Sequence, residues 1–189
     1  RTLHRAIVAF EDSGFLLRDV LVWKKPSAHH RAQRFSSILE KRELYEEAKK
    51  WEGWRLGNLA PIYEPIAWFF KPYKHTITDN ILKNEVGAMN IEGCKINDVS
   101  PTNLLEFGFE KHEERIHEAQ KPEKLIEYLI KLTTVENQII LDPFMGSGTT
   151  AICSKNLNRQ FIGFEIMEDY YKKSLERLNN ANIHIHLDR

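Results

Sequence analysis

The side chains best suited to hold a ligand lie in residues 139–150. An apolar segment, residues 139–141, ends in the carboxylate of Asp142, and Gly146 and Gly148 follow before a run that fits the start of a helix. Glycine lets the backbone turn tightly and lets a ligand approach the main chain closely. A helix after such a turn directs its free N–H groups and positive dipole end at the ligand. The pattern predicts a nucleotide or nucleoside pocket at the carboxyl end of a strand.

A second carboxylate supports this pocket. Glu165 ends the apolar segment 161–164 and lies 23 residues after Asp142. That separation is close to the roughly 20 residues at which an acidic side chain meets the hydroxyls of a bound ribose. We therefore predict that Glu165 binds a ribose.

Three other interpretations of the turn are weaker. A phosphate-binding loop would need Lys after the last glycine, where Thr149 stands. The three-glycine dinucleotide pattern matches poorly, and a purely structural turn leaves the second acidic strand end unexplained. A nucleoside that carries a carboxylate instead of phosphates, such as S-adenosylmethionine, fits best.

Hydrophobic periodicity predicts the elements that position these residues. Strands are expected at residues 15–23, 65–70, 138–142, 160–165 and 183–187, and helices at residues 2–13, 35–51, 122–132, 148–157 and 169–180. Residues 73–118 read as polar and irregular. Strands that alternate with helices favour parallel pairing with right-handed crossovers. The predicted fold class is α/β with a mostly parallel sheet.

The composition is that of an ordinary globular domain. Of the 189 residues, 42% are apolar, and 27 Lys and Arg balance 27 Asp and Glu, so net charge neither favours nor excludes a polyanionic partner. Cys94 and Cys153 indicate neither a disulfide framework nor a metal site. The sequence has no apolar run near 18 residues, so we expect a cytoplasmic protein that does not enter a membrane.

The segments 142–150 and 161–166 closely resemble the cofactor motifs of the amino-methylating DNA methyltransferases, which methylate N6 of adenine or N4 of cytosine. Residues 117–122 resemble the element that closes over the methionine end of the cofactor in this family, and their position before the cofactor strand is typical of the permuted β class. Further similarity at residues 1–4, 64–66, 71–72, 87–90 and 101–103 extends the resemblance over nearly the whole chain. Ala119 departs mildly, since many relatives have Thr there.

The resemblance implies a Rossmann-like, S-adenosylmethionine-dependent methyltransferase fold that acts on double-stranded DNA, with adenine favoured over cytosine, often beside a restriction endonuclease. It divides the chain into residues 1–72, the far side of the domain with a basic DNA-facing insertion; residues 73–115, the target-recognition segment; and residues 116–189, the cofactor-binding half. The cofactor-binding residues that it implies are Asp142, Phe144, Gly146, Ser147, Gly148, Thr149, Glu165, Gln120, Lys121 and Pro122.

One family element is missing from the sequence. The Asp/Ser/Asn-Pro-Pro-aromatic loop that clamps the flipped base is absent, because no two prolines are adjacent. Methylation of cytosine C5 would need a cysteine nucleophile, and the settings of Cys94 and Cys153 do not fit one. No catalytic residue is therefore assigned. By resemblance the central strands of the sheet are also missing, and we expect exposed apolar faces and a marginally stable chain.

A basic run follows the first expected strand. DNA-binding candidates in it are Lys24, Lys25, His29, His30, Arg31 and Arg34, and a solvated loop is the alternative. Residues 24–55 hold nine Lys and Arg against five Asp and Glu. Trp51 and Trp54 are expected to pack more readily than to stack on bases, and His117 to pack or hydrogen-bond more readily than to catalyse.

Two alternatives to a DNA methyltransferase remain. The first is a non-catalytic fragment or subunit of a split methyltransferase that binds cofactor or DNA only. Its partner would be the polypeptide that carries the missing catalytic loop, or a second copy in a homodimer. The second is a methyltransferase that acts on RNA or on a small molecule.

Overall fold

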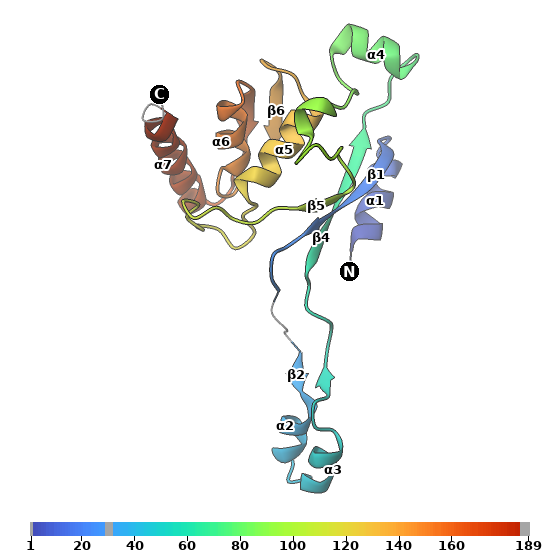
Figure 1. Cartoon of the computed structure of the whole chain (residues 1–189), viewed down its shortest axis with the longest axis vertical. Coiled ribbons are helices and arrows are strands. Elements are labelled where there is room, and N and C mark those ends of the chain that lie inside the picture. Colours follow the sequence, from blue (N-terminus) through green and yellow to red (C-terminus); the bar gives the residue numbers. More distant parts are fainter. Residues whose placement is uncertain (1, 29–31, 186–189) are drawn as a thin grey trace.

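The computed structural model describes residues 2–28 and 32–185. The elements, in chain order, are α1 (Leu3–Asp12), β1 (Leu16–Lys24), β2 (Gln33–Arg34), α2 (Phe35–Glu40), α3 (Tyr45–Lys50), β3 (Arg55–Leu56), β4 (Tyr63–Phe70), α4 (Ile77–Asn84), the short 3-10 helix η1 (Glu92–Cys94), β5 (Leu104–Glu106), α5 (Glu123–Thr133), β6 (Ile139–Asp142), α6 (Thr149–Asn156), β7 (Gln160–Gly163) and α7 (Glu168–Ile185). Figure 1 shows a body at one end and a long arm that carries α2 and α3 at the other.

The strands form three separate small sheets in the described part of the chain. β6 and β7 pair in parallel, with Asp142 opposite Gly163, as predicted. β1 pairs in parallel with β5 but antiparallel with β4 over its whole length. The expectation of mostly parallel pairing therefore holds for β6–β7 and β1–β5 only, because β1 runs out to the arm and β4 runs back from it.

Helix α5 joins the two sheets of the body. Its apolar stripe includes Leu125 (1% exposed) and Leu132, which pack with Leu21, Trp23 and Leu105 of the β4–β1–β5 sheet. Another side of α5 packs against α6, which in turn covers β6 and β7. Pro122 immediately precedes the helix, where its fixed φ suits a helix start. The body thus has one main core, centred on α5.

The arm comprises residues 25–62, and we call residues 33–56 its tip. β2 and β3 pair antiparallel at the tip, and α2 and α3 close over Leu39 and Ala48, which are buried. Phe35 meets Trp51 edge-on, with ring centroids 5.6 Å apart. The tip therefore has a small core of its own, away from the body (Figure 1).

Three expectations about secondary structure are wrong. The helix expected at residues 35–51 is two helices, because the chain reverses through Glu43, whose φ is 61°. Residues 73–118 are not irregular throughout, since they contain α4 with a Thr76–Asp79 capping box, and β5. The strand expected at 183–187 is wrong as far as Ile185, because α7 extends to that residue. The last two residues of the expected strand lie outside the described part.

Candidate cofactor site

The turn after β6 is built from backbone hydrogen bonds and left-handed glycines. The Asp142 side chain accepts a hydrogen bond from the N–H of Phe144 (3.0 Å), which starts the turn. Gly146 (φ 53°) and Gly148 (φ 76°) are both buried and adopt the left-handed region that favours glycine. Gly148 precedes α6 without offering a side-chain cap. The first N–H groups of α6 are thus available to a ligand that lies against the turn.

Glu165 reaches this turn from the end of β7. Its Oε2 accepts a hydrogen bond from the N–H of Gly146 (2.8 Å), and its Oε1 accepts one from the N–H of Met167 (2.8 Å). The hydrogen bond from Met167 is the largest influence on the Glu165 pKa; together with Gly146 and His117 it outweighs desolvation and lowers that pKa below 4.5. A carboxylate offers about four acceptor positions, so two remain for a ligand. The structure therefore brings Asp142, Gly146 and Glu165 together.

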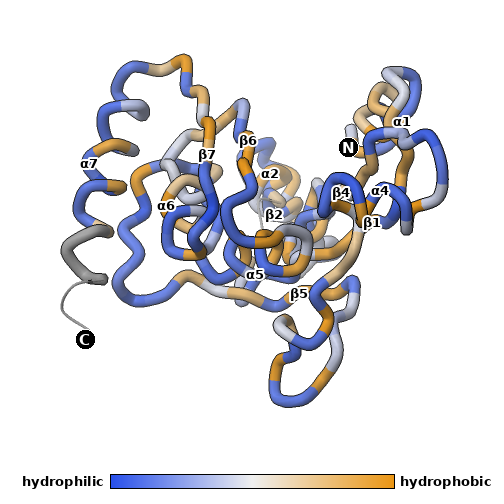
Figure 2. Tube along the Cα trace, turned by 90° about the horizontal axis from the view of Figure 1, so that it is seen from above, coloured by the Kyte–Doolittle hydropathy of each residue, from blue (hydrophilic) through white to orange (hydrophobic). Residues whose placement is uncertain are grey.

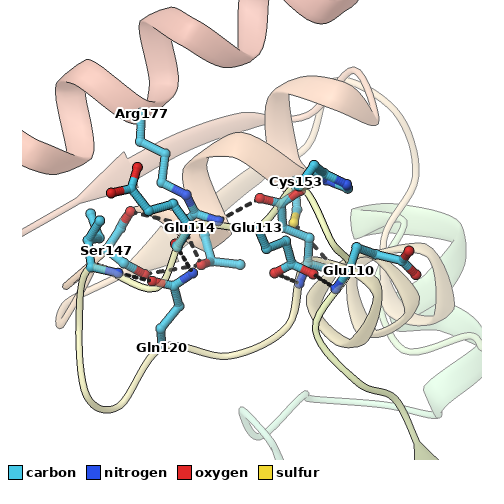
Figure 3. A network of polar contacts seen from close by, with 11 residues as sticks. Glu110, Glu113, Glu114, Gln120, Ser147, Cys153 and Arg177 are labelled. Atoms are coloured by element: carbon cyan, nitrogen blue, oxygen red, sulfur yellow. Dashed lines mark hydrogen bonds and ion pairs between the residues drawn. The ribbon is translucent and has the colours of Figure 1, made fainter.

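The predicted residues Ser147 and Thr149, at the end of the turn and the start of α6, contact α7. Both are buried, and Arg177 of α7 donates hydrogen bonds to the Ser147 carbonyl (3.1 Å) and to Thr149 Oγ1 (2.9 Å). Arg177 also forms an ion pair with Glu123 at the start of α5. Figure 3 shows Arg177 next to Ser147 within this network. α5, α7 and the turn are therefore tied together by one guanidinium group.

The loop 117–122 lies against the turn through His117, which has the packing role expected of it. Its ring is 3.8 Å from the position that a Cβ on Gly146 would take, and it meets the Tyr170 ring edge-on at 4.4 Å between centroids. Gln120 is buried and shapes the loop itself: its Oε1 accepts from Ile116 N–H (3.1 Å) and its Nε2 donates to the Glu114 carbonyl (3.0 Å).

The other two predicted residues of this loop point to the rest of the body. Lys121 Nζ lies 2.8 Å from Glu64 Oε2 at the start of β4, and Pro122 is fully buried at the start of α5. Burial raises the pKa of Glu64, but hydrogen bonding and charge from Lys121 and then Lys25 outweigh it and lower that pKa below 4.5. In this structure, therefore, Lys121 fastens the loop to β4.

The basic run divides in the structure. Lys24 pairs with Glu106 (2.9 Å) and Lys25 with Glu64 (3.5 Å), whereas Arg34 lies exposed at the tip of the arm. His29, His30 and Arg31 lie outside the described residues. The DNA contacts predicted for this run stay predictions.

Several residues of the site have no sequence signal of their own. Arg177 and Tyr170 lie on α7, and nothing in the pattern of that helix separates them from surface residues. Glu113 is buried and its Oε2 accepts a hydrogen bond from the first N–H of α5 (3.0 Å), so it holds the start of that helix (Figure 3).

Ile166, which follows Glu165, is 96% exposed, and the predicted Phe144 is 87% exposed. Both provide apolar surface beside the turn.

Two hollows lie in the described part of the body, and neither lies at the turn. One hollow of about 920 Å³ lies behind it, between the 112–116 loop and the helices α6 and α7. Another of about 600 Å³ lies between the end of β4 and α4. Neither is lined by Asp142, Gly146 or Glu165. The described residues contain no cluster of His, Cys, Asp and Glu that could hold a metal ion.

One face of the β6–β7 sheet is uncovered in the described part of the chain. Ile139, Leu141, Ile162 and Phe164 are each about half exposed or more. Figure 2 shows apolar stretches of β6 and β7 side by side, next to the more polar α7.

None of the described helices combines the length and apolar character that a membrane crossing requires.

Comparisons with known proteins agree with this geometry. The sequence profile of a family described as DNA methylase matches residues 1–176. The chain is 46% identical over 182 residues to the type II methyltransferase M.HindIII of Haemophilus influenzae, covering 93% of this chain and 59% of that protein. It is 34% identical over 174 residues to M.BglII of Bacillus subtilis, covering 85% of this chain and 42% of that protein. The chain thus spans about half the length of these relatives.

Solved structures show the same fold. The crystal structure of the M1.HpyAVI–SAM complex superposes with a TM-score of 0.64 at 27% identity, covering 95% of this chain and 70% of that one. The cytosine-N4-specific PvuII DNA methyltransferase superposes with a TM-score of 0.62 at 20% identity, covering 94% of this chain and 60% of that one. The predicted family resemblance and fold class are confirmed: the chain belongs to the DNA methylase family.

Proposed function

We propose that the chain forms the cofactor-binding half of an S-adenosylmethionine-dependent enzyme that methylates an exocyclic amino group in duplex DNA. The observation that carries the proposal is the hydrogen bond from Gly146 N–H to Glu165 Oε2 (2.8 Å). It joins the glycine turn, which the sequence predicted to form a nucleoside pocket, to the carboxylate predicted to bind the ribose of that nucleoside. The family membership and the similarity to M.HindIII support the same chemistry.

The residues fit that cofactor in three ways. The free acceptor positions of Glu165 suit the ribose diol. The exposed side chains of Phe144 and Ile166 offer apolar faces to an adenine ring. The first N–H groups of α6, beyond Gly148, suit a carboxylate. When bound, S-adenosylmethionine supplies an activated methyl group, and the protein's task is to orient it towards the amine.

The roles proposed for the remaining predicted residues are indirect. Ser147 and Thr149 shape the turn through Arg177, while Gln120, Lys121 and Pro122 shape and anchor the loop beside it. DNA would approach on the side of this loop, where the basic run begins.

Methyl transfer from labelled cofactor tests the proposal. The protein as encoded, with any sequence that flanks residues 1–189, is incubated with methyl-tritiated S-adenosylmethionine and either duplex DNA or RNA. We expect label in the amino groups of adenine or cytosine in duplex DNA and none in RNA. Label in RNA alone, or in neither polymer with cofactor bound, would contradict a DNA amino-methyltransferase.

A second candidate, one part of a split methyltransferase, is favoured by the uncovered face and free edge of the β6–β7 sheet. β6 pairs only with β7 among the described strands, and Leu141 and Ile162 on it are 62% and 49% exposed. A polypeptide with the Pro-Pro-aromatic loop and its strands would cover this face. Mixing the chain with such a polypeptide should restore methylation if the enzyme is split. Full activity of the chain alone, or no activity after a complex has formed, would contradict this candidate.

A further inference from the structure

The charge of the chain is divided between the arm and the body. The arm, residues 25–62, contains eight Lys and Arg against five Asp and Glu, which leaves nineteen against twenty-two in the rest of the chain. A net charge of zero thus conceals an arm that is positive and a body that is negative by the same amount. A polyanion would be attracted to the arm and repelled by the body.

The tip of the arm carries cations that are free to bind. Lys49 and Lys50 on α3 form ion pairs with Glu46 and Glu47 at 2.9 and 3.8 Å. By contrast, Arg34, Lys41 and Arg42 are exposed and have no carboxylate within ion-pair distance in the described part of the chain. Their charges are therefore neutralised only by solvent ions, which a bound phosphate would release.

An exposed aromatic side chain lies near Arg34, because Arg34 pairs with Arg55 and the N–H of Phe35 donates to the Trp54 carbonyl. Trp54 is 62% exposed, although it meets the Trp51 ring edge-on at 5.2 Å between centroids. Trp51 is itself packed against Phe35, so the position of the Trp54 ring is restrained. An indole held in this way offers an apolar surface to the sugars of a nucleic-acid backbone.

The arm leaves the body on the side of the candidate cofactor turn. Glu64, at the root of the arm, pairs with both Lys25 and Lys121, and Lys121 belongs to the loop that contacts the turn through His117. The opposite end of β6 faces α4, because Gln138 Nε2 donates to the Glu85 carbonyl (2.9 Å). From Arg55 back to Tyr63 the extended chain can span at most roughly 29 Å, about eight base pairs of duplex.

We propose that the tip is a second contact with duplex DNA, separate from the site of methylation and additional to Lys24 and Lys25 at the root of the arm. Arg34, Lys41 and Arg42 contact phosphates, and Trp54 packs on a deoxyribose several base pairs from the methylated base. The tip thereby adds affinity for the duplex and fixes its position on the protein. This inference rests on the proposed function, since it takes duplex DNA as the substrate.

The test measures binding of a labelled duplex as a function of salt concentration, with the protein as encoded. Lys41→Ala combined with Arg42→Ala should reduce the slope of log K against log salt by about two. The matched control, Lys49→Ala with Lys50→Ala, removes two cations that are already paired and should change the slope by less. Trp54→Ala should weaken binding several-fold, whereas Tyr45→Ala, at a site that is 60% exposed, should not.

A deletion of the tip provides a second test. A Cβ placed on Gly57 would lie 3.4 Å from Ala32 Cα, so the two strands are close enough there to be joined by two glycines in place of residues 33–56. The deletion should lower DNA affinity and leave S-adenosylmethionine affinity unchanged. Unchanged DNA affinity and salt slope in all these variants, with cofactor still bound, would overturn the role of the tip alone. A dimer that the deletion converts to a monomer, without loss of DNA binding, would overturn it in favour of a protein partner.

Loss of cofactor binding by the unaltered protein would instead count against the proposed function itself. The two failures are therefore distinguishable, because calorimetry with S-adenosylmethionine does not involve the arm.

Discussion

The cofactor turn and the tip of the arm are stabilised in opposite ways. The turn is held by residues of other elements: Glu165, after β7, accepts a hydrogen bond from Gly146, and Arg177 of α7 donates one to Ser147, 30 positions away. The tip is held by contacts inside residues 33–56, since Trp51 packs on both Phe35 and Trp54. The turn is therefore a product of the whole body, whereas the tip is a local unit that can change without disturbing it.

Truncation of one leucine in each region should reveal this difference most strongly. Leu125→Ala opens a cavity in the main core and should cost about 3–4 kcal/mol of global stability. Leu39→Ala in the tip should cost less, about 1–2 kcal/mol, because the tip can unfold locally. Chemical denaturation with hydrogen exchange checks both. Equal global losses would mean that tip and body unfold as one unit.

The ion pair behind the turn gives the next largest effect. Arg177→Met leaves Glu123 with only the more distant His112 (3.5 Å) as an ionic partner, at a site where the Arg177 and Glu123 side chains are 13% and 16% exposed, and should cost about 3 kcal/mol. Lys172→Met removes a pair with Glu168 whose side chains are 64% and 77% exposed, and should cost less than about 0.5 kcal/mol. Thermal unfolding of both variants measures the two losses of stability. A similar small loss in both would show that Arg177 does not hold the turn.

Two glycines with nearly the same φ separate backbone strain from packing. Gly148 (φ 76°) would place a Cβ 3.0 Å from Ser174 Cβ, whereas Gly53 (φ 80°), in the tip, has no atom within 4 Å of that position. Gly53→Ala should cost about 1 kcal/mol through φ alone. Gly148→Ala should cost about 2–3 kcal/mol, because α7 must also move. The difference between the unfolding midpoints of the two variants measures the free-energy cost of the contact with Ser174. Equal costs for both variants would exclude that contact.

The pH dependence of the turn should be smaller still. The Glu165 pKa is lowered below 4.5 in the folded chain, so its contribution to stability is fully present above the unfolded value and is lost as pH falls through the folded one. Nuclear magnetic resonance of the Gly146 amide should show a titration with a midpoint below 4.5. Glu165→Gln should remove that titration. A midpoint above 4.5 would mean that the hydrogen bonds from Gly146 and Met167 are not formed in solution.

The sequence predicted what is encoded locally. The glycine turn, Glu165 and the parallel pairing of β6 with β7 follow from apolar runs that end in carboxylates at a fixed spacing. α4 could also have been predicted, because Thr76 and Asp79 form the spacing of a capping box. The break at Glu43 could not, since no glycine marks the residue that adopts a positive φ there.

What the sequence could not predict depends on distant contacts. Arg177 looks like any basic residue on an amphipathic helix, and only the packing of α7 against α6 places it behind Ser147. Lys121 was expected beside the cofactor because of its motif, but the ion pair with Glu64 spans 57 positions that no local pattern connects. The arm is likewise an insertion between the paired strands β1 and β4. The sequence indicated its excess of positive charge but not its shape.

Calorimetric titration with S-adenosylmethionine tests the central claim most directly, when performed on the protein as encoded and on two matched variants. Glu165→Ala removes the carboxylate at the turn, and Glu168→Ala removes an exposed one three residues further on. We expect binding by the unaltered protein, a loss of roughly 10- to 100-fold for Glu165→Ala, and no change for Glu168→Ala. Affinity that is absent from the unaltered protein, or equal in all three, would contradict the assignment of this turn as the cofactor site.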